Sequence, residues 1–422
     1  MEATRIRLAE GVHLTYLPAR KFKTSLLSAQ FVTPLRRETA GANALLAAVL
    51  RRGTVSCPDM GALSAKMDNL YDASIDYTVR KKGENQCVGF VASFIDDRYA
   101  PDGERLLEPA AALLGELICD PVTYHGRFVP EYFESEKTNL LEAIRSLIND
   151  KRDWADSRLL RALCDGEAYA VPRLGDEETV DKLQALKVYT QYRDLISTAP
   201  LEIIYSGSAD LERVKQALAA AFATLPREEV RVISTAAPHV CRESVQHVED
   251  VLDVTQGKLG MGFSCGSDDM PALLMGNTLF GGSSNSKLFL NVREKLSLCY
   301  YASSLYHRQK GLITVSSGIE FQNYQRAYDE IMAQLEAVQK GELEDWELEG
   351  ARSTLLNSYA TVGDSQGKLE NFYLGQAATG QHETPADLAR AIQDMTAERI
   401  CRAMSTVKLD TVYFLKGKEV EA

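Results

Sequence analysis

Hydrophobic and polar positions along the chain form short apolar runs typical of strands, separated by longer stretches with helical periodicity. In the first half, strands are predicted at residues 26–32, 74–79, 87–94 and 201–207. Helices between them are predicted at residues 41–54, 60–71 and 106–118. In the second half, the predicted strands are 258–264, 299–306, 311–317 and 411–417, and the predicted helices are 270–280, 287–295 and 324–338.

The two halves of the chain repeat one order of elements. The segments LSAKMDNLYDASIDY and LFLNVREKLSLCYYA align at an offset of about 225 residues, which indicates a duplicated domain. Runs of strands followed by runs of helices predict the α+β class, with two homologous domains, each a mainly antiparallel sheet with helices packed on one face. The predicted boundaries are an N-terminal domain at 1–228, a linker at 229–249 and a C-terminal domain at 250–422.

Composition narrows the class of protein. Lys and Arg number 47 against 59 Asp and Glu, and the net charge of −12 argues against nucleic-acid binding. An acidic inner surface would instead favour basic peptides. Apolar runs fall short of the ~20 residues of a membrane span, so we expect no membrane partner. The charged N-terminus is unlike a signal peptide, and eight scattered cysteines indicate reduced thiols, so we expect a cytoplasmic protein.

The predicted helix 41–54, GANALLAAVLRRGT, carries small residues on one face. Ala44, Ala47 and Ala48 are spaced at i, i+3 and i+4, so their β-carbons lie together. Arg51 and Arg52 are expected in the last turn, and Gly53 is expected to end the helix. Taken alone, this is a helix whose small side chains allow another element to come close.

The same stretch resembles the signature helix of the pitrilysin/insulinase metallopeptidases (inverzincins), where a glycine precedes an H-x-x-E-H motif and a Gly-Thr pair follows it. The two glycine positions of that pattern are kept here, but both histidine positions fall on Ala44 and Ala48. The glutamate position falls on Ala47. Zinc needs imidazole and carboxylate donors, and its bound water needs a general base; methyl groups supply neither.

A fourth position supports the same conclusion. The resemblance implies a third zinc ligand seven residues after a glutamate of a later helix, and in YFESEKTNLLEAIRSL this position, counted from Glu136, is Ala143. Glu134, Glu136 and Glu142 of that helix are expected on a solvated face. The histidines offer no pair at helical ligand spacing; they are His13, His125, His239, His247, His307 and His382. We therefore expect no metal and no cofactor in this chain.

The second half keeps another part of the resemblance. FGGSSNSKLFLNVREKLSLCYY is similar to the family's glycine-rich turn followed by R-E-K-x-x-L-x-Y. The resemblance implies that Arg293 and Tyr300 hold the substrate backbone and stabilise the oxyanion opposite a zinc ion, for which a guanidinium and a phenol are suitable donors. The alternative is an ordinary exposed helix end and an ordinary strand residue.

Two further patterns carry less weight. GFSCG at 262–266 formally matches the nucleophile elbow around Ser264, but the repeat places it on a strand of an antiparallel sheet. Cys299 has no adjacent histidine to activate it, so a buried thiol is expected.

The resemblance to the mitochondrial-processing-peptidase type of this family gives three hypotheses. The leading one is a non-catalytic subunit that binds peptides or unfolded polypeptides and brings Arg293 and Tyr300 to the active site of a zinc-bearing homologous subunit. Peptide would bind by strand addition to a sheet edge. The alternatives are a peptide-binding scaffold without proteolysis and an active homodimeric peptidase with a relocated metal site.

Overall fold

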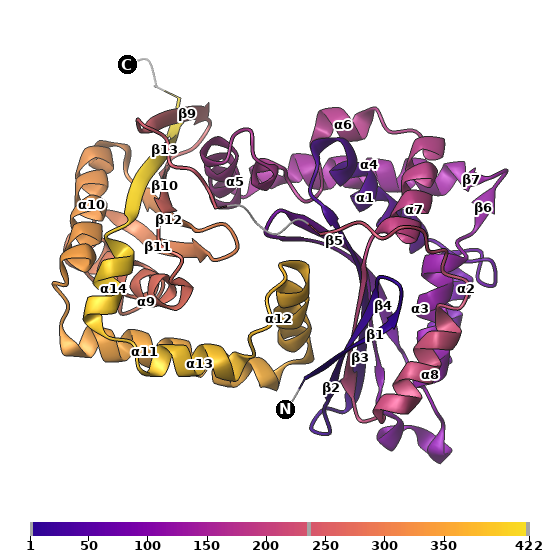
Figure 1. Ribbon diagram of the computed structural model, residues 1–422. Coiled ribbons are helices and arrows are strands. Elements are labelled where there is room, and N and C mark those ends of the chain that lie inside the picture. The colour runs from indigo at the N-terminus through magenta and orange to yellow at the C-terminus, as the bar shows by residue number, and fades with distance from the viewer. Residues whose placement is uncertain (1–2, 234–237, 419–422) are drawn as a thin grey trace. The chain divides into compact units, whose positions relative to one another are not determined.

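The computed structural model describes residues 3–233 and 238–418, which form two compact units (Figure 1). Unit 1 lies within residues 1–145, 171–235 and 363–382, and unit 2 within residues 146–170, 236–362 and 383–422. Each unit thus contains two segments whose chain neighbours on both sides belong to the other unit. The predicted domains 1–228 and 250–422 are each one continuous stretch of sequence, whereas each unit combines separate stretches of the chain.

Unit 1 is built on a six-stranded sheet in the order β1-β2-β8-β3-β5-β4. Only the β2–β8 pair is parallel among these neighbours, and the other pairs are antiparallel. The strands are β1 (Thr4–Ala9), β2 (Val12–Pro18), β3 (Thr24–Pro34), β4 (Ser74–Lys82), β5 (Asn85–Ile95) and β8 (Leu201–Gly207). Two short strands, β6 (Thr123–Tyr124) and β7 (Arg127–Phe128), form a separate hairpin.

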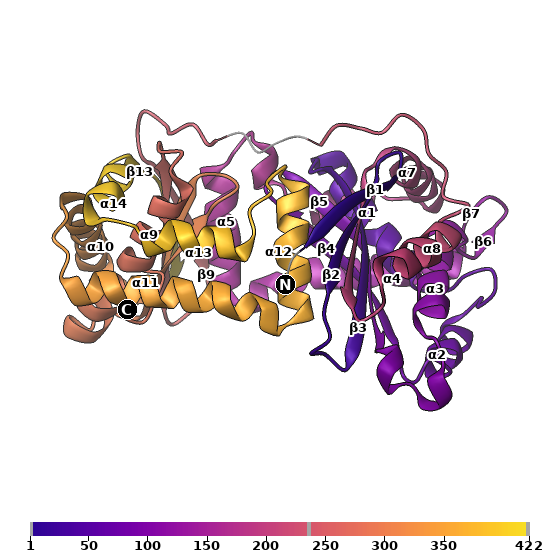
Figure 2. The same cartoon turned by 60° about the horizontal axis from the view of Figure 1, so that its bottom comes forward.

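Helices cover both faces of the unit 1 sheet. On β3, Leu27, Ala29 and Phe31 pack in the main hydrophobic core with α1 and α3. The alternate residue Ser28 faces the other side, where its hydroxyl donates to Glu370 of α12 at 2.7 Å. Figures 1 and 2 both show α12 on the side of the sheet away from α1 and α3. The helices are α1 (Arg37–Leu50), α2 (Met60–Asp68), α3 (Leu107–Cys119), α4 (Pro130–Ser146), α6 (Glu177–Asp181), α7 (Ala185–Thr198), α8 (Leu211–Ala221) and α12 (Gln366–Ala378).

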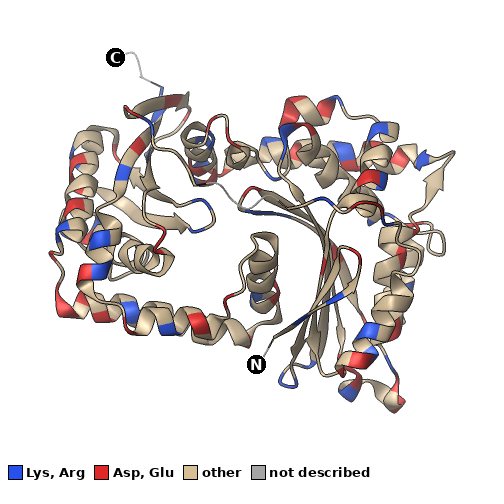
Figure 3. Ribbon diagram, in the orientation of Figure 1, with Lys and Arg blue, Asp and Glu red and all other residues tan. Residues whose placement is uncertain are grey.

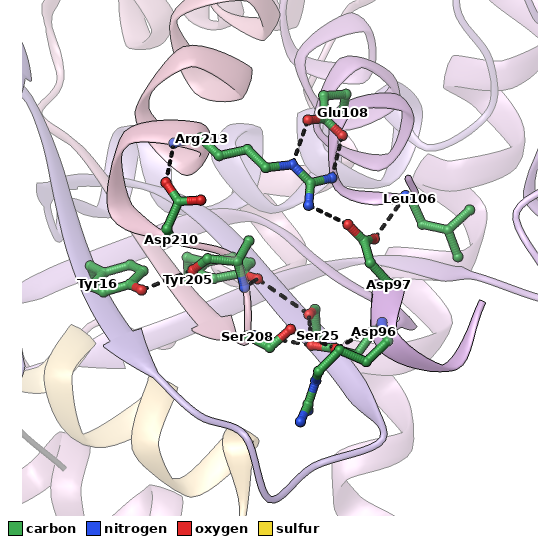
Figure 4. Close-up of polar contacts among 12 residues, drawn as sticks. Tyr16, Ser25, Asp96, Asp97, Leu106, Glu108, Tyr205, Ser208, Asp210 and Arg213 are labelled. Atoms are coloured by element: carbon green, nitrogen blue, oxygen red, sulfur yellow. Dashed lines mark hydrogen bonds and ion pairs between the residues drawn. The ribbon is translucent and has the colours of Figure 1, made fainter. Parts of the chain in front are cut away.

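A buried carboxylate forms hydrogen bonds that connect the end of this sheet to the loop before α8. Asp96, at the end of β5, accepts hydrogen bonds from the Ser25 hydroxyl at 3.0 Å and from the Ser208 hydroxyl at 2.7 Å. Figure 4 shows these contacts and, beside them, the ion pairs from Arg213 to Asp97 and Glu108. Burial alone would raise the pKa of Asp96, but hydrogen bonds from Ser208 and Arg98 outweigh it and hold the pKa below its usual range.

We expect Asp96→Asn to lower the free energy of unfolding by about 1–3 kcal/mol, because the amide replaces acceptor oxygens with a donor among existing donors. Urea unfolding followed by circular dichroism measures the loss. Asp68→Asn, an exposed change in the same unit, is the control and should be neutral. Equal stability of the two variants would contradict the assigned role of Asp96.

Unit 2 is built on a five-stranded sheet in the order β11-β12-β10-β13-β9, with the β13–β9 pair parallel. The strands are β9 (Gln246–Leu252), β10 (Gly257–Cys265), β11 (Cys299–His307), β12 (Leu312–Ile319) and β13 (Val407–Gly417). Helix α5 packs on β10 and β13, with Leu159 against Tyr413 and Leu415. The helices are α5 (Lys151–Leu163), α9 (Met270–Phe280), α10 (Tyr324–Lys340), α11 (Asp345–Ala360), α13 (Pro385–Gln393) and α14 (Ala397–Met404), with a π-helix at Leu288–Lys295.

The predicted α+β class with mainly antiparallel sheets is confirmed. Helices were expected on one face of each sheet, but in unit 1 α12 covers the other face, where Glu370 binds Ser28 and Arg80.

The motif helix was misplaced. The helix expected at 41–54 is α1, Arg37–Leu50, so Arg51 and Arg52 follow it and do not lie in its last turn. Gly53 is required for a different reason: a β-carbon there would lie 2.7 Å from the backbone of Pro58. Within the predicted linker, strand β9 begins at Gln246, and residues 234–237 lie outside the described residues.

All eight cysteines are free thiols. Burial raises the pKa of Cys87 and of Cys265 to about 12, which leaves little thiolate at neutral pH. Across the two described stretches, every helix is too short or too polar to cross a bilayer.

Candidate functional site

The structure brings the three alanines at the expected ligand positions to one cavity. Ala44 and Ala48 of α1 and Ala143 of α4 line a cavity of about 800 Å³ within unit 1, which we call the alanine cavity. Ala44 and Ala48 lie on the same side of α1 because four residues are slightly more than one helical turn. The other lining residues come from β4, α4, the segment before α6, and α12; they are Tyr77, Thr78, Val79, Arg80, Lys81, Lys82, Glu136, Asn139, Leu140, Arg173, Leu174 and Asn371.

Ala47, at the expected position of the general base, is placed differently. It is 0% exposed and packs in the hydrophobic core of unit 1, and it is not among the residues that line the cavity. A longer side chain at this position would have to displace core atoms. Ala44 also packs in this core, but Ala44 and Ala48 differ from Ala47 in lining the cavity.

The alanine cavity does not fit a zinc ion. Its methyl groups have no donor atoms, and its single acidic lining residue, Glu136, is already engaged. Glu136 accepts from Nη1 of Arg52 at 2.9 Å and from Nδ2 of Asn139 at 3.2 Å. Glu136 is 8% exposed, so the expectation of a solvated position was wrong for this residue, because Arg52 reaches it from the end of α1. Glu134 and Glu142 are exposed, as expected.

The alanine cavity runs along an edge of the sheet. Strand β4 is the last strand at its end of the unit 1 sheet, and residues 77–82 of it line the cavity. On its outer edge, the carbonyl oxygen of Ile75 accepts from Nε of Arg51 at 2.5 Å, and that of Val79 accepts from Nη1 of Arg173 at 3.2 Å. Backbone direction alternates along an antiparallel strand, so the N–H and C=O of Tyr77, between them, face the same edge.

Tyr77 experiences charges of both signs in the alanine cavity. Burial and the nearby Glu136 carboxylate raise the pKa of its phenol, while the Arg173 guanidinium opposes that shift. The phenol therefore stays protonated at neutral pH and can donate a hydrogen bond to a bound molecule.

Arg293 and Tyr300 lie in unit 2. Arg293 is near the end of the π-helix, with its guanidinium carbon 4.7 Å from the centre of the Phe289 ring and Nη1 3.6 Å from Glu294. Tyr300 is on β11, an edge strand, and is 60% exposed. Its hydroxyl donates to Oε1 of Glu320 at 2.5 Å, and this hydrogen bond raises the pKa of the phenol. Each side chain thus has an acidic neighbour of its own.

Gly281 of the preceding glycine-rich turn allows a close approach. A β-carbon at this position would lie 2.7 Å from the backbone nitrogen of Ser304 and from a methyl group of Leu288. The turn therefore fixes the start of the π-helix against β11, the strand that carries Tyr300.

One group of potential metal ligands does form within residues 3–233 and 238–418. Ligand atoms of Cys164, Glu167 and His239 lie within 4.8 Å of one another in unit 2. However, the ammonium of the buried Lys310 contacts the Glu167 carboxylate. The ring nitrogens of His239 lie 2.5 Å from Glu167 and 3.2 Å from Asp410. A cation would have to displace Lys310, so this group is better described as a buried ion-pair cluster than as a relocated metal site.

The remaining candidate nucleophiles are buried. Ser264 lies within β10, between β12 and β13, and not at a strand-to-helix turn. Burial raises the pKa of Cys299. Neither residue has the geometry of an activated nucleophile.

Sequence reasoning missed two features of the sites. The basic lining of the alanine cavity was signalled by Arg80, Lys81 and Lys82 at the end of a predicted strand. The ion-pair cluster gave no local signal, because Glu167, Lys310 and Asp410 are far apart in the sequence.

Comparisons with known proteins agree with this geometry. Residues 182–355 match the family model described as "Peptidase M16 inactive domain". The chain is 34% identical over 416 residues to the probable inactive metalloprotease YmfF of Bacillus subtilis (strain 168), covering 97% of this chain and 96% of the relative. A crystal structure of a conserved protein from Enterococcus faecalis V583 is 27% identical, with a TM-score of 0.90 and complete coverage of both chains. A peptidase M16 inactive domain from Pseudomonas fluorescens shares the fold at 18% identity, with a TM-score of 0.81 over 100% of this chain and 99% of that one.

Proposed function

Because this chain belongs to the M16 (pitrilysin/insulinase) metallopeptidase family and carries alanine at the positions where the resemblance implies zinc ligands, we propose that it is the non-catalytic, peptide-binding subunit of a heteromeric peptidase. The observation that carries the proposal is the convergence of Ala44, Ala48 and Ala143 on one cavity beside an edge strand. The cavity keeps the space and the sheet edge that a peptide needs, while the donors that a metal needs are missing. A cytoplasmic location and a zinc-bearing homologous partner are parts of this proposal.

Peptide would bind by adding a strand to β4 along the alanine cavity. The Tyr77 N–H and C=O face this edge, and backbone hydrogen bonds of this kind are tolerant of sequence. The carbonyl groups of Ile75 and Val79 are held by arginine side chains, which protect the edge from unwanted pairing. A peptide strand would replace these side chains one at a time.

Arg293 and Tyr300 would act in the partner's active site. A phenol that keeps its proton and a guanidinium are donors to a developing oxyanion, and both side chains are accessible in unit 2. Tyr300 would exchange its hydrogen bond to Glu320 for one to the substrate.

We expect Arg293→Ala and Tyr300→Phe each to lower the kcat of the assembled enzyme about 10²-fold, the usual cost of removing one oxyanion donor. The assay mixes the purified chain with a purified zinc-bearing M16 homologue from the same genome and follows cleavage of an internally quenched peptide. Arg326→Ala and Tyr124→Phe, at exposed positions, are the matched controls. Size-exclusion chromatography verifies that every variant still assembles.

Unchanged kcat in both variants would exclude the composite site, and cleavage by the chain alone would exclude a non-catalytic role. A second candidate is a peptide-binding scaffold without proteolysis, favoured by the hydrogen bond that already holds Tyr300 to Glu320. This candidate predicts peptide binding without cleavage in the presence of any homologue.

A further inference from the structure

The sign of the charge around the alanine cavity is opposite to that of the chain. The net charge is −12, and Figure 3 shows acidic and basic residues interspersed on outer helices such as α8 and α10. The cavity, however, is lined by four basic side chains and one acidic one. The basic residues are Arg80, Lys81, Lys82 and Arg173.

Ion pairs account for part of this charge. The Glu136 carboxylate is matched by Arg52 at 2.9 Å. The guanidinium of Arg80 is matched by Glu370 of α12, through two hydrogen bonds of 2.6 and 2.7 Å. In each of these two pairs the charges cancel, and the second arginine of the lining is Arg173.

This side chain contacts a neutral oxygen: Nη1 of Arg173 donates to the Val79 carbonyl at 3.2 Å. A carboxylate is a stronger acceptor for this cation than a neutral oxygen is, because the hydrogen bond is then charge-assisted on both sides.

Addition of a peptide strand to β4 would change the contacts of the Arg173 guanidinium. The guanidinium occupies the Val79 carbonyl on the outer edge of β4, which is an acceptor that an added strand would use. The backbone N–H of an incoming strand would take this place and release the guanidinium beside the peptide. The planar fork of arginine is suited to bidentate binding of a carboxylate.

We propose that the alanine cavity selects extended peptides that carry a carboxylate, from an acidic side chain or from a chain terminus, and that Arg173 is the residue that determines this specificity. The proposal rests on the proposed peptide binding at β4 and names its ligand class. It replaces the expectation of a preference for basic peptides, which was drawn from the net charge of the chain, with one drawn from the residues that line the cavity.

Fluorescence anisotropy with labelled nine-residue peptides of alternating Thr and Val tests the proposal. One peptide carries two central Asp residues and an amidated C-terminus, and its matched forms carry Asn or Lys instead. A fourth peptide carries Asn and a free C-terminal carboxylate. At 50 mM NaCl we expect the Asp form to bind about tenfold more tightly than the Asn form, with the advantage shrinking at 300 mM NaCl.

Arg173→Gln should reduce that advantage to about threefold or less while leaving the affinity for the Asn peptide nearly unchanged. Arg127→Gln, at an exposed position of β7 outside the cavity, is the matched control and should leave both affinities unchanged. An advantage of the fourth peptide alone assigns the site to a chain terminus, and one of the Asp peptide alone assigns it to a side chain. Equal binding of the Asp, Asn and Lys peptides would overturn this inference and leave peptide binding intact, whereas no binding of any peptide would overturn the proposed function itself.

Discussion

A chain carrying Ala44→His, Ala48→His and Ala143→Glu is expected to bind about one zinc ion, whereas the natural chain is expected to bind none. The three positions line one cavity of about 800 Å³ into which the new side chains can extend, although Ala44 also packs in the core of unit 1. Two imidazoles on one helix face and a carboxylate from a second helix form the three-ligand set of a catalytic zinc site. The effect is large because the natural side chains provide no donor atoms.

Metal analysis by mass spectrometry after dialysis against metal-free buffer measures the bound zinc. The double variant Ala44→His/Ala48→His is the control and should bind zinc about tenfold or more weakly, because one ligand is missing. Adding Ala47→Glu should lower the melting temperature, since this position is buried in the core and a carboxylate there is desolvated. Stoichiometric zinc in the natural chain, or none in the triple variant, would show that the alanine cavity is not the former metal site.

Asp410→Asn is expected to lower the free energy of unfolding of unit 2 by about 3–5 kcal/mol, the usual cost of removing one partner of a buried ion pair. Asp410 is 0% exposed. Its carboxylate accepts from the N–H of Arg242 at 2.8 Å, from Nη1 of Arg242 at 2.6 Å and from the Thr411 hydroxyl at 2.7 Å. The amide would place a donor against these donors and leave Arg242 and His239 without this counter-charge.

The same carboxylate predicts a pH dependence. Burial would raise the pKa of Asp410, but the hydrogen bonds from Arg242, Thr411 and His239 outweigh it and hold the pKa below its usual value. Its stabilising contribution is therefore complete above the unfolded-state pKa of about 3.9 and is lost as the pH falls through the folded-state value. The stability difference between the natural chain and Asp410→Asn should accordingly shrink as the pH falls below ~4.

Urea unfolding at each pH measures this difference, and Asp253→Asn, at an exposed position of unit 2, is the control. A stability difference below about 1 kcal/mol at pH 7 would mean that the buried ion pairs of Asp410 are balanced by their own desolvation.

Sequence spacing located the parts of the candidate site that lie on single elements. Ala44 and Ala48 share a face because of helical periodicity, and this held although the helix begins at Arg37 and not at Gly41. Ala143 was placed by the family resemblance, which implies a ligand seven residues after Glu136, and the structure brings it to the same cavity.

The other features of the fold and of the candidate site depend on contacts between segments that are far apart in the sequence, and local periodicity does not encode such contacts. Ser28 and Glu370 are 342 positions apart, so nothing near either residue indicates that α12 covers β3. The burial of Glu136 depends on Arg52, and the charge of the cavity depends on which cations have acidic partners elsewhere in the fold.

The helix that covers the second face of the unit 1 sheet also constrains the order in which the protein matures. Residues 366–378 are translated late, so that face of the six-stranded sheet of unit 1 stays uncovered until most of the chain has left the ribosome. The face that α12 later covers carries Ser28 and Arg80, which bind Glu370 in the folded chain. Before α12 docks, these polar groups are hydrated and do not form an apolar patch to which other nascent chains would bind. Because its contacts with the sheet are polar, α12 can dock late in synthesis without leaving an apolar surface exposed before it does.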